Sequence, residues 1–578
     1  MKSNEDKSIK LRILLVGIVF SLCLSVIGAR AIHLQYFCES WLSQKAADQY
    51  EKSYISRGQR GTIYDTNHRE MAVSIDVSSI AVYPPKIKDT RKAVKALSGV
   101  LNIDSRALKK KLESKKPFVW VKRQVTPKET EAVKALKLDG IAFRSERKRF
   151  YPNRTLAAQV IGFSGIDGQG LEGIEFNYNA FLEGDAGNYK VLKDALGRGF
   201  DGDKNMTPGY SGNNLILTID RTIQYISEKA LEEAVLEFSA KSGMVIVMVP
   251  ETGAILAQAH VPFFNPNAFN RFKKELWRNR GITDQFEPGS TMKIFSAAAA
   301  LESGSSSPST IFFCENGAYS IGKNVVHDIH PRGWLSLQQI VKYSSNIGAV
   351  KVGELMGFEA LYNTLRNFGF GEKTGIDSPG ETAGSLAHYK RWVKIDAGNI
   401  SFGQGISVSA LQLISATSAI ANGGILMKPY IVQAITDHNG RIVKCFGPKI
   451  VRRAVSTNTA RALIRIMKSV TSEGGTGIKG APEGYTVGGK TGTAQKVNEK
   501  GTYEEGQYVA SFVGFAPAEK PEISILVMID EPQKNHYGGI VAAPVFKKIA
   551  RETLQYMNIL PNGKAGRLVV SRGNEERI

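Results

Sequence analysis

The longest apolar stretch of the chain lies close to its N-terminus. Residues 13–29 (ILLVGIVFSLCLSVIGA) carry no charge, and Arg30 is followed by a second, partly apolar segment that ends at Phe37. A helix needs about 20 apolar residues to cross the ~30 Å hydrocarbon core of a bilayer. Four basic residues precede the run, which favours a cytoplasmic N-terminus. The pattern therefore predicts a membrane anchor over residues 13–37, a cytoplasmic tail at residues 1–12, and export of the rest of the chain.

A cleaved signal peptide is the alternative interpretation of this segment. The sequence Ala29-Arg-Ala31 is similar to a signal-peptidase cleavage site. The apolar run is longer than the ~7–15 residues of a usual signal core. Its length therefore favours an uncleaved anchor.

Between the anchor and about residue 210, short apolar stretches alternate with glycine and basic residues. Residues 38–51 are typical of a polar helix, and two short apolar runs near residues 63 and 71–75 predict strands on either side of a turn. Residues 91–122 contain helix-like stretches rich in lysine, which are typical of a solvated helix face. This part of the chain is expected to form an irregular, β-rich module.

From about residue 214 the pattern changes to longer apolar runs. We expect strands at 244–249, 254–259, 508–515 and 523–529, a helix at 222–238, and helices at 290–303, 337–355 and 410–422 between the two pairs of strands. A sheet built from both ends of a segment around a helical insertion is an α+β arrangement. The predicted fold class is therefore α+β, with an antiparallel sheet and a helical lobe.

Composition narrows the range of partners. The chain has 578 residues, enough for two or three domains, and a net charge of +21. It contains no zinc-ligand spacing, RNA-binding signature or basic helix with heptads, so we expect no nucleic acid. An anionic membrane surface and an anionic cell wall also suit a basic exported protein. The four cysteines suggest neither a disulfide framework nor a metal site, and we expect no metal or cofactor.

Three short motifs follow one another in the second half of the chain: Ser290-Thr-Met-Lys293, Ser344-Ser-Asn346 and Lys490-Thr-Gly-Thr493. Taken singly, Ser344 is explained by a helix cap and Lys490 by a surface charge. Together they supply a nucleophile, groups that move its proton, and a substrate clamp. Lys293 lies one helical turn after Ser290 and reaches its hydroxyl. A desolvated lysine beside a second cation, here Lys490, is neutral enough to act as the base.

The ordered set is the signature of penicillin-binding proteins and serine β-lactamases. The segment 284–293 (DQFEPGSTMK) resembles the nucleophile region of class B penicillin-binding proteins, and residues 57–65 resemble the start of their non-catalytic pedestal. The resemblance implies the domain organisation 1–12 cytoplasmic tail, 13–37 anchor, 38–210 dimerisation or pedestal domain, 211–557 transpeptidase domain and 558–578 flexible tail. It also implies a serine β-lactamase-like fold for the transpeptidase domain.

The resemblance assigns roles to the motif residues. The serine at position 290 attacks a D-Ala-D-Ala stem peptide and forms an acyl-enzyme. Ser344 relays a proton to the leaving amine, and Asn346 holds Lys293 and the substrate backbone. Residues 490–493 form an edge strand, on which Gly492 permits close approach and Thr491 and Thr493 bind the terminal carboxylate. The backbone N–H groups of residues 290 and 493 form the oxyanion hole.

Three functions remain open on this basis: a peptidoglycan D,D-transpeptidase that β-lactams inhibit, a β-lactamase or D,D-carboxypeptidase that uses water, and a non-catalytic scaffold. The pedestal and anchor favour the first. We find no convincing Glu-x-x-x-Asn deacylation element between residues 346 and 490, and Glu381 suits a solvated loop. The contexts 82–85 and 278–280 are similar to the septal, division-specific type, with side-wall elongation as the alternative. A SEDS-type glycosyltransferase and other division proteins are the implied partners.

Overall fold

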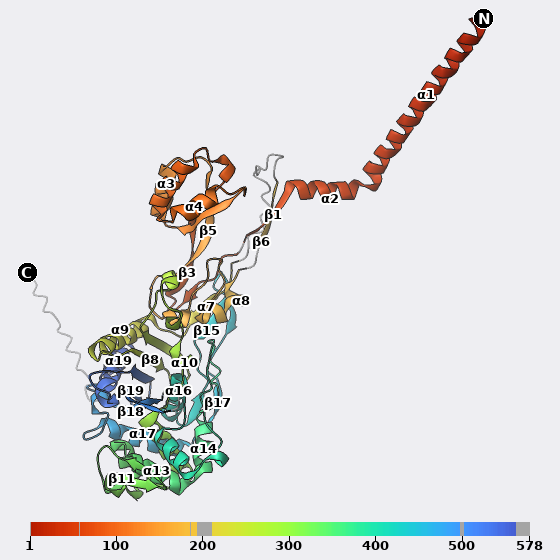
Figure 1. The fold of residues 1–578 in the computed structure, drawn as a ribbon. Helices are drawn as coiled ribbons and strands as arrows, with labels where there is room; N and C mark the ends of the chain where they lie inside the picture. Colours follow the sequence, from red (N-terminus) through yellow and green to blue (C-terminus); the bar gives the residue numbers. More distant parts are fainter. Residues whose placement is uncertain (1, 57, 185–186, 193–210, 498–501, 562–578) are drawn as a thin grey trace, which may run out of the picture. The chain divides into compact units, whose positions relative to one another are not determined.

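The structure, a computed structural model, describes residues 2–56, 58–184, 187–192, 211–497 and 502–561 (Figure 1). It forms two compact units, one of Met1–Gln59 with Gly184–Ser211 and one of Arg60–Glu183 with Gly212–Ile578. Residues 193–210 of the predicted pedestal and residues 562–578 of the predicted flexible tail lie outside the described residues.

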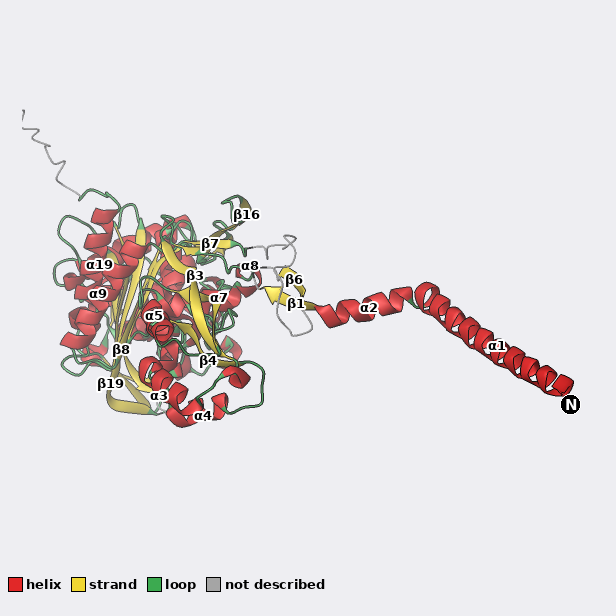
Figure 2. Cartoon of the chain, turned by 90° about the horizontal axis from the view of Figure 1, so that it is seen from above, coloured by secondary structure: helices red, strands yellow, loops and turns green. Residues whose placement is uncertain are grey.

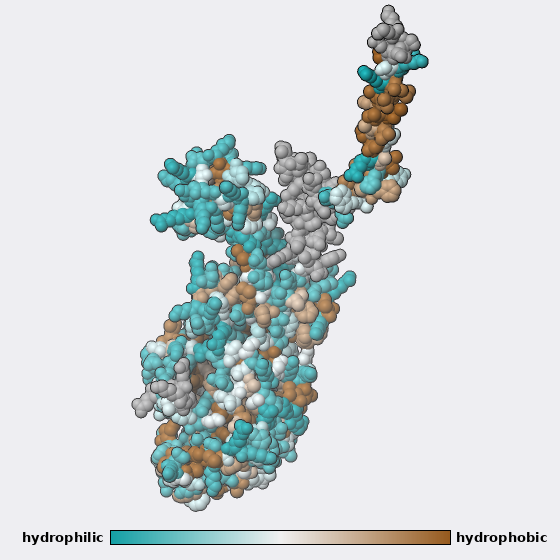
Figure 3. Space-filling view, turned by 45° about the vertical axis from the view of Figure 1, so that its right-hand side comes forward, coloured by the Kyte–Doolittle hydropathy of each residue, from teal (hydrophilic) through white to brown (hydrophobic). Residues whose placement is uncertain are grey.

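The first unit contains the predicted anchor. Helix α1 (Lys2–Ile32) continues into a π-helical turn (His33–Phe37). The span Lys7–Phe37 is long and apolar enough to cross a membrane, and its most apolar 18 residues have a mean hydropathy of 2.4. Figure 3 shows its apolar side chains as a brown band along the helix. Helix α2 (Glu39–Tyr50) follows, and β1 (Glu51–Ser56) pairs antiparallel with β6 (Gly187–Leu192). The apolar run of the sequence thus forms one helix, as predicted, which is long enough to serve as a single-pass anchor.

A seven-stranded sheet connects the pedestal to the catalytic region within the second unit. Its order is β16-β15-β7-β2-β3-β4, with β5 also paired to β3. The strands are β2 (Ile63–Tyr64), β3 (Glu70–Val82), β4 (Val119–Val125), β5 (Ile141–Phe150), β7 (Asn214–Leu217), β15 (Val432–Thr436) and β16 (Ile442–Cys445). The sheet therefore joins strands from both sides of the predicted domain boundary at residue 211.

Three helices pack against the C-terminal half of β3. They are α3 (Thr90–Leu101), α4 (Ser105–Leu112) and α5 (Pro127–Ala135), and they bury Leu97, Leu108 and Val133 against the sheet. The lysines at 109–111 are exposed, as predicted for a solvated helix face. Nearer the catalytic region lie three short helices, α6 (Ala158–Ile161), α7 (Gly173–Asn177) and α8 (Asn179–Leu182).

A five-stranded antiparallel sheet forms the centre of the catalytic region, in the order β18-β19-β20-β8-β9. These strands are β8 (Ser242–Met248), β9 (Ile255–Val261), β18 (Gly488–Val497), β19 (Tyr503–Ala516) and β20 (Ile523–Asp530). Helices α9 (Arg221–Glu237) and α19 (Ala543–Tyr556) share one hydrophobic core with this sheet (Figure 2). Helix α16 (Ala410–Ala421) belongs to a second core, which also includes residues of this sheet. The predicted α+β arrangement is confirmed, and β18 is an edge strand as expected.

The other helices and two-stranded ribbons of this unit include those of the helical lobe. They are α10 (Arg280–Thr283), α11 (Lys293–Glu302), α12 (Leu337–Tyr343), α13 (Asn346–Met356), α14 (Phe358–Asn367), α15 (Lys394–Phe402), α17 (Thr457–Thr471), α18 (Gly538–Val541) and the strands β10 (Ile311–Phe313), β11 (Ala318–Ile321), β12 (Asn324–His327), β13 (Trp334–Ser336), β14 (Ile425–Met427) and β17 (Ile450–Arg453). The four cysteines are free thiols.

One predicted helix is wrong. The segment 337–355 is not a single helix, because it breaks between α12 and α13. Ser344 has a φ of +63° and ψ of +39°, a left-handed conformation that ends α12, and Ser345 caps the start of α13. Left-handed backbone is uncommon for residues other than glycine and often marks a functional site.

Candidate active site

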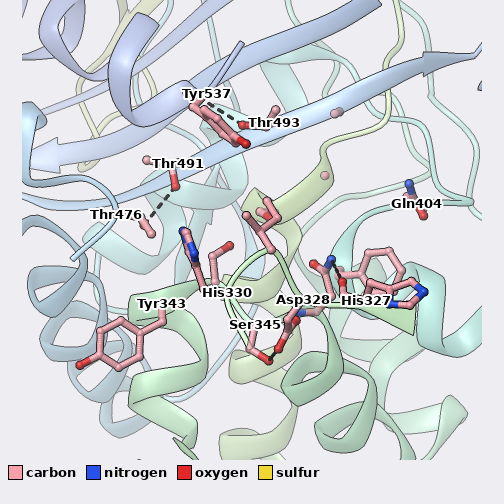
Figure 4. Close-up of a pocket in the computed structure, with 18 of the residues that line it drawn as sticks. His327, Asp328, His330, Tyr343, Ser345, Gln404, Thr476, Thr491, Thr493 and Tyr537 are labelled. Carbon is pink, nitrogen blue, oxygen red and sulfur yellow. Dashed lines mark hydrogen bonds between the residues drawn. The ribbon is translucent and has the colours of Figure 1, made fainter. Parts of the chain in front are cut away.

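Three elements of the second unit bring the sequence motifs to one cleft. The 3₁₀ turn Gly289–Met292 with α11 carries the first motif, the turn between α12 and α13 the second, and edge strand β18 the third. The cleft has a volume of about 730 Å³ (Figure 4). Of the eight predicted site residues, five line it: Ser290, Ser344, Asn346, Thr491 and Thr493. The other three, Lys293, Lys490 and Gly492, are buried immediately behind its wall.

The Lys293 amine is surrounded by oxygen atoms from the first two motifs. Its Nζ lies 2.7 Å from Ser290 Oγ, 2.7 Å from Asn346 Oδ1 and 3.0 Å from the Ser344 carbonyl oxygen. A neutral amine donates its two hydrogens to the amide and carbonyl oxygens, which accept only. Its lone pair is then left for the Ser290 hydroxyl proton. The geometry therefore suits Lys293 to deprotonate Ser290.

Burial supports that protonation state. Lys293 is 1% exposed, and burial lowers its pKa to about 7, although the negative charge of Asp328 acts in the opposite direction. A substantial neutral fraction therefore exists near neutral pH. A base whose pKa is near the working pH combines availability with the ability to take a proton.

Ser344 lies between the two buried lysines. Its Oγ is 3.3 Å from Lys293 Nζ and 3.0 Å from Lys490 Nζ. Lys490 is fully buried, and burial, with the nearby Lys293 charge, holds its pKa well below the ordinary value. The sequence placed Lys490 beside Lys293, and the structure brings them together through Ser344. Its amine, however, faces Ser344 and the Thr491 carbonyl from behind the strand and does not line the cleft.

Strand β18 presents alternate side chains to the cleft, as a strand does. Thr491 and Thr493 face it, whereas Lys490 and Gly492 face the protein. A Cβ on Gly492 would lie 2.3 Å from Ser511 Oγ and 2.9 Å from Thr291 Cγ2, so only glycine permits the nucleophile turn to pack here. The structure thus requires glycine at position 492 for packing within the protein, and its role toward the substrate stays a prediction.

Asp328 is a site residue to which the sequence analysis assigned no role. Its carboxylate accepts hydrogen bonds from Ser345 Oγ (2.5 Å), Asn346 N (2.5 Å) and Ile347 N (3.1 Å). It thus caps α13 directly after the left-handed Ser344, and Figure 4 shows it against Ser345. The Asn346 amide nitrogen donates to the His327 carbonyl oxygen at 2.9 Å. Asp328 and its neighbour therefore hold the second motif in place.

Glu287 is the other carboxylate of the cleft lining. One of its oxygens accepts from Gly405 N at 2.8 Å and the other from the Tyr503 hydroxyl at 3.1 Å. Burial raises its pKa. Glu381 lies outside the lining and bonds to the backbone of residues 374 and 375, which agrees with the loop interpretation made from sequence.

Comparisons with known proteins agree with this geometry. Residues 243–551 match the family described as the penicillin binding protein transpeptidase domain, and residues 55–217 match the penicillin-binding protein dimerisation domain.

The chain is also similar to named relatives over most of its length. It is 37% identical to the probable peptidoglycan D,D-transpeptidase PenA of Neisseria gonorrhoeae, covering 95% of this chain and 93% of that protein. It is 35% identical to the peptidoglycan D,D-transpeptidase FtsI of Escherichia coli, covering 89% of this chain and 87% of that protein. A crystal structure of penicillin-binding protein 3 from Mycobacterium tuberculosis with aztreonam matches with a TM-score of 0.70 at 27% identity, covering 88% of this chain and 98% of that one.

The motif geometry, the two domain matches and the full-length relatives support one assignment. The resemblance drawn from the motifs is thereby confirmed. With its nucleophile turn, its Ser-x-Asn turn and its edge strand assembled around one cleft, the chain belongs to the penicillin-binding protein transpeptidase family.

Proposed function

We propose that this protein is a membrane-anchored serine D,D-transpeptidase that cross-links peptidoglycan stem peptides and is acylated by β-lactams. The observation that carries the proposal is the 2.7 Å contact of Lys293 Nζ with Ser290 Oγ, made by an amine whose pKa is about 7. A serine needs such a base to become a nucleophile. The similarity to named D,D-transpeptidases supplies the substrate class.

In the proposed acylation, Ser290 Oγ attacks the carbonyl carbon of the penultimate D-alanine while Lys293 takes the hydroxyl proton. The backbone N–H groups of Ser290 and Thr493 stabilise the oxyanion. The C–N bond then breaks, and the departing D-alanine amine receives a proton from Lys293 through the Ser344 hydroxyl. The Ser344 position, within 3.3 Å of Lys293 Nζ and 3.0 Å of Lys490 Nζ, supports this relay.

The acyl-enzyme is resolved by the amine of a second stem peptide. That amine attacks the ester carbonyl, loses a proton to the same relay, and restores the Ser290 hydroxyl. Thr491 and Thr493, which face the cleft from β18, bind the terminal carboxylate of the donor. Lys490 supports this clamp from behind the strand, through its contacts with Ser344 and Thr491.

Acylation of the full-length protein in detergent tests the proposal. Fluorescent penicillin should label the wild type on Ser290, the adduct should persist for many minutes, and the antibiotic should be hydrolysed negligibly. Ser290→Ala should abolish labelling, whereas Ser320→Ala, at an exposed serine of β11, should not. An adduct on another residue would contradict the nucleophile, and rapid multiple-turnover hydrolysis would favour a β-lactamase.

The proposed cellular role is septal wall synthesis during division. The contexts 82–85 and 278–280 and the similarity to FtsI support it. The basic residues that precede the apolar run within α1 support a cytoplasmic N-terminus and an extracytoplasmic catalytic domain. A SEDS-type glycosyltransferase, contacted through the anchor and pedestal, is the proposed partner. A fluorescent fusion should concentrate at midcell; a uniform side-wall signal would favour elongation instead.

A further inference from the structure

The cleft continues past Thr491, away from the nucleophile turn. Thr491 Oγ1 lies 3.2 Å from Thr476 Oγ1, and Thr476 Oγ1 donates to the Lys342 carbonyl oxygen at 3.4 Å. Tyr343, the next residue, lines the cleft together with Arg332. Figure 4 shows Thr491, Thr476 and Tyr343 on one side of the cleft and Gln404 on the other.

Arg332 is held in this end of the cleft without a counter-charge. Its guanidinium carbon lies 3.9 Å from the centre of the Tyr343 ring, a cation–π contact that fixes the plane of the group. Its Nε is buried and has no hydrogen-bond partner in the described part of the chain. No carboxylate among the described residues forms an ion pair with Arg332 or with Lys479 at the same end. A buried donor without a partner needs an explanation, and a bound ligand is one.

The carboxylates of the cleft wall are already engaged. Asp328 accepts two hydrogen bonds from the second motif and one from Ile347 N, and Glu287 accepts from Gly405 N and the Tyr503 hydroxyl. Two further lysines, Lys293 and Lys490, are buried behind the wall. A planar guanidinium with free donors, in such surroundings, matches the two oxygens of a carboxylate.

The direction in which the donor peptide lies in the cleft indicates which stem peptide supplies the carboxylate for Arg332. In the proposed function Thr491 and Thr493 hold the terminal carboxylate of the donor, so the donor chain ends there. The cleft beyond Thr491 therefore lies past the end of the donor and is free for the second stem peptide. Resting on that proposed function, we infer that Arg332, assisted by Lys479, forms a subsite that binds a carboxylate of the acceptor stem peptide.

Acceptor preference in the full-length protein tests this subsite. The donor is a stem pentapeptide whose side-chain amine is acetylated, so that it cannot act as acceptor. The acceptors are the tripeptide L-Ala-γ-D-Glu-meso-diaminopimelate and the same tripeptide with its carboxylates amidated. Mass spectrometry measures the ratio of cross-linked product to hydrolysed donor for each. Wild type should prefer the carboxylate acceptor about tenfold, equivalent to about 1.4 kcal/mol.

Substitution of Arg332 should remove this preference and spare the donor reaction. Arg332→Gln should reduce it to less than about threefold, and Arg332→Lys, which keeps the charge but loses the planar fork, should retain part of it. Arg461→Gln, at an exposed arginine of α17 outside the cleft, should behave as wild type. Labelling by fluorescent penicillin should change by less than about twofold in all of them.

Two results would overturn the subsite alone: an unchanged preference in Arg332→Gln, or a loss of penicillin acylation that matches the loss of transfer. The second would show that Arg332 supports the fold of the site. A wild-type acyl-enzyme that transfers to neither acceptor would contradict the proposed function itself, and the subsite with it.

Discussion

Two buried clusters of charged side chains lie in the second unit, one in the pedestal and one in the active site. In the pedestal, Glu175 is fully buried between Arg60 and Arg149, and both arginines reach it at 2.6 Å. In the active site, Lys293 and Lys490 are equally buried, but their amines contact hydroxyl, carbonyl and amide oxygens. The charged groups are similarly buried in the two clusters. They differ in their partners, which carry the opposite charge in the pedestal and are uncharged in the active site.

This difference in partners decides whether a buried ionisable group keeps its charge or can change its protonation state. Burial raises the pKa of Glu175, but the two arginines outweigh it and hold that pKa below the ordinary value. The pedestal charges are therefore permanent. Among the residues that the structure describes, no carboxylate forms an ion pair with either lysine, and burial lowers the pKa of both. The ion pairs of Glu175 stabilise the pedestal, whereas the amines of Lys293 and Lys490, which have no ion-pair partner among the described residues, can exchange protons.

The largest expected effect comes from unpairing the pedestal cluster. Glu175→Gln leaves two buried arginines without a counter-charge, and removal of one partner from a buried ion pair costs about 3–5 kcal/mol. We expect a loss of this size in the free energy of unfolding of the full-length protein, measured by denaturant titration. Glu113→Gln, which breaks an exposed pair with Lys109, should change stability by less than about 1 kcal/mol. Equal effects of both would contradict the comparison.

The Glu175 cluster should also make the stability of the protein sensitive to acid. Because the pKa of Glu175 is lower in the folded than in the unfolded state, its contribution is complete above the ordinary value of 4.5 and is lost as pH falls through the folded pKa. Wild type should therefore lose stability below that pH more steeply than Glu175→Gln.

The next largest effect concerns the second lysine. Lys490→Ala removes the amine that holds Ser344 Oγ, and we expect acylation by penicillin to slow by about 10²-fold or more, the usual size of a lost proton-transfer group. Lys490→Arg keeps the cation and should lose less, although its planar shape fits the site poorly. Stopped-flow acylation rates measure both. Small and equal effects would refute a role for this charge.

The smallest effect is a shift in pH dependence. Acylation should rise with pH through about 7, as Lys293 becomes neutral. Asp328→Asn removes the negative charge that favours the Lys293 ammonium, so the rise should move to lower pH. The loss of capping hydrogen bonds at α13 should also lower the plateau, by about tenfold or less. A lowered plateau with an unmoved midpoint would show that Asp328 acts through geometry alone.

Sequence patterns predicted much of the fold because they reflect local rules. The anchor, helix α9 and the strands of the five-stranded sheet follow from runs of apolar residues that bury one face or cross a bilayer. The break at Ser344 did not follow from them, because residues 337–355 keep a helical apolar pattern through it. The capping carboxylate of Asp328 comes from a separate loop, so a local pattern does not contain it.

The site shows the same division. The order and spacing of the motifs predicted a nucleophile, its base, the Ser-x-Asn turn and the edge strand. They predicted Lys490 as a second cation beside Lys293, but not that its amine is buried behind the strand against Ser344. Strand alternation allows either face of β18 to meet the cleft, and only packing against the nucleophile turn selects one. No sequence pattern pointed to Arg332, because its proposed role depends on its contact with Tyr343 and on having no ion-pair partner among the described residues.

The sequence by itself predicted the long apolar helix, the α+β class and the motif residues that meet in the cleft. Composition, periodicity and motif spacing depend only on the order of residues along the chain. Tertiary structure alone decided the protonation of those groups. Lys293 and Lys490 are about 200 residues apart in the sequence, and their pKa values depend on the burial and the neighbours that folding brings to each.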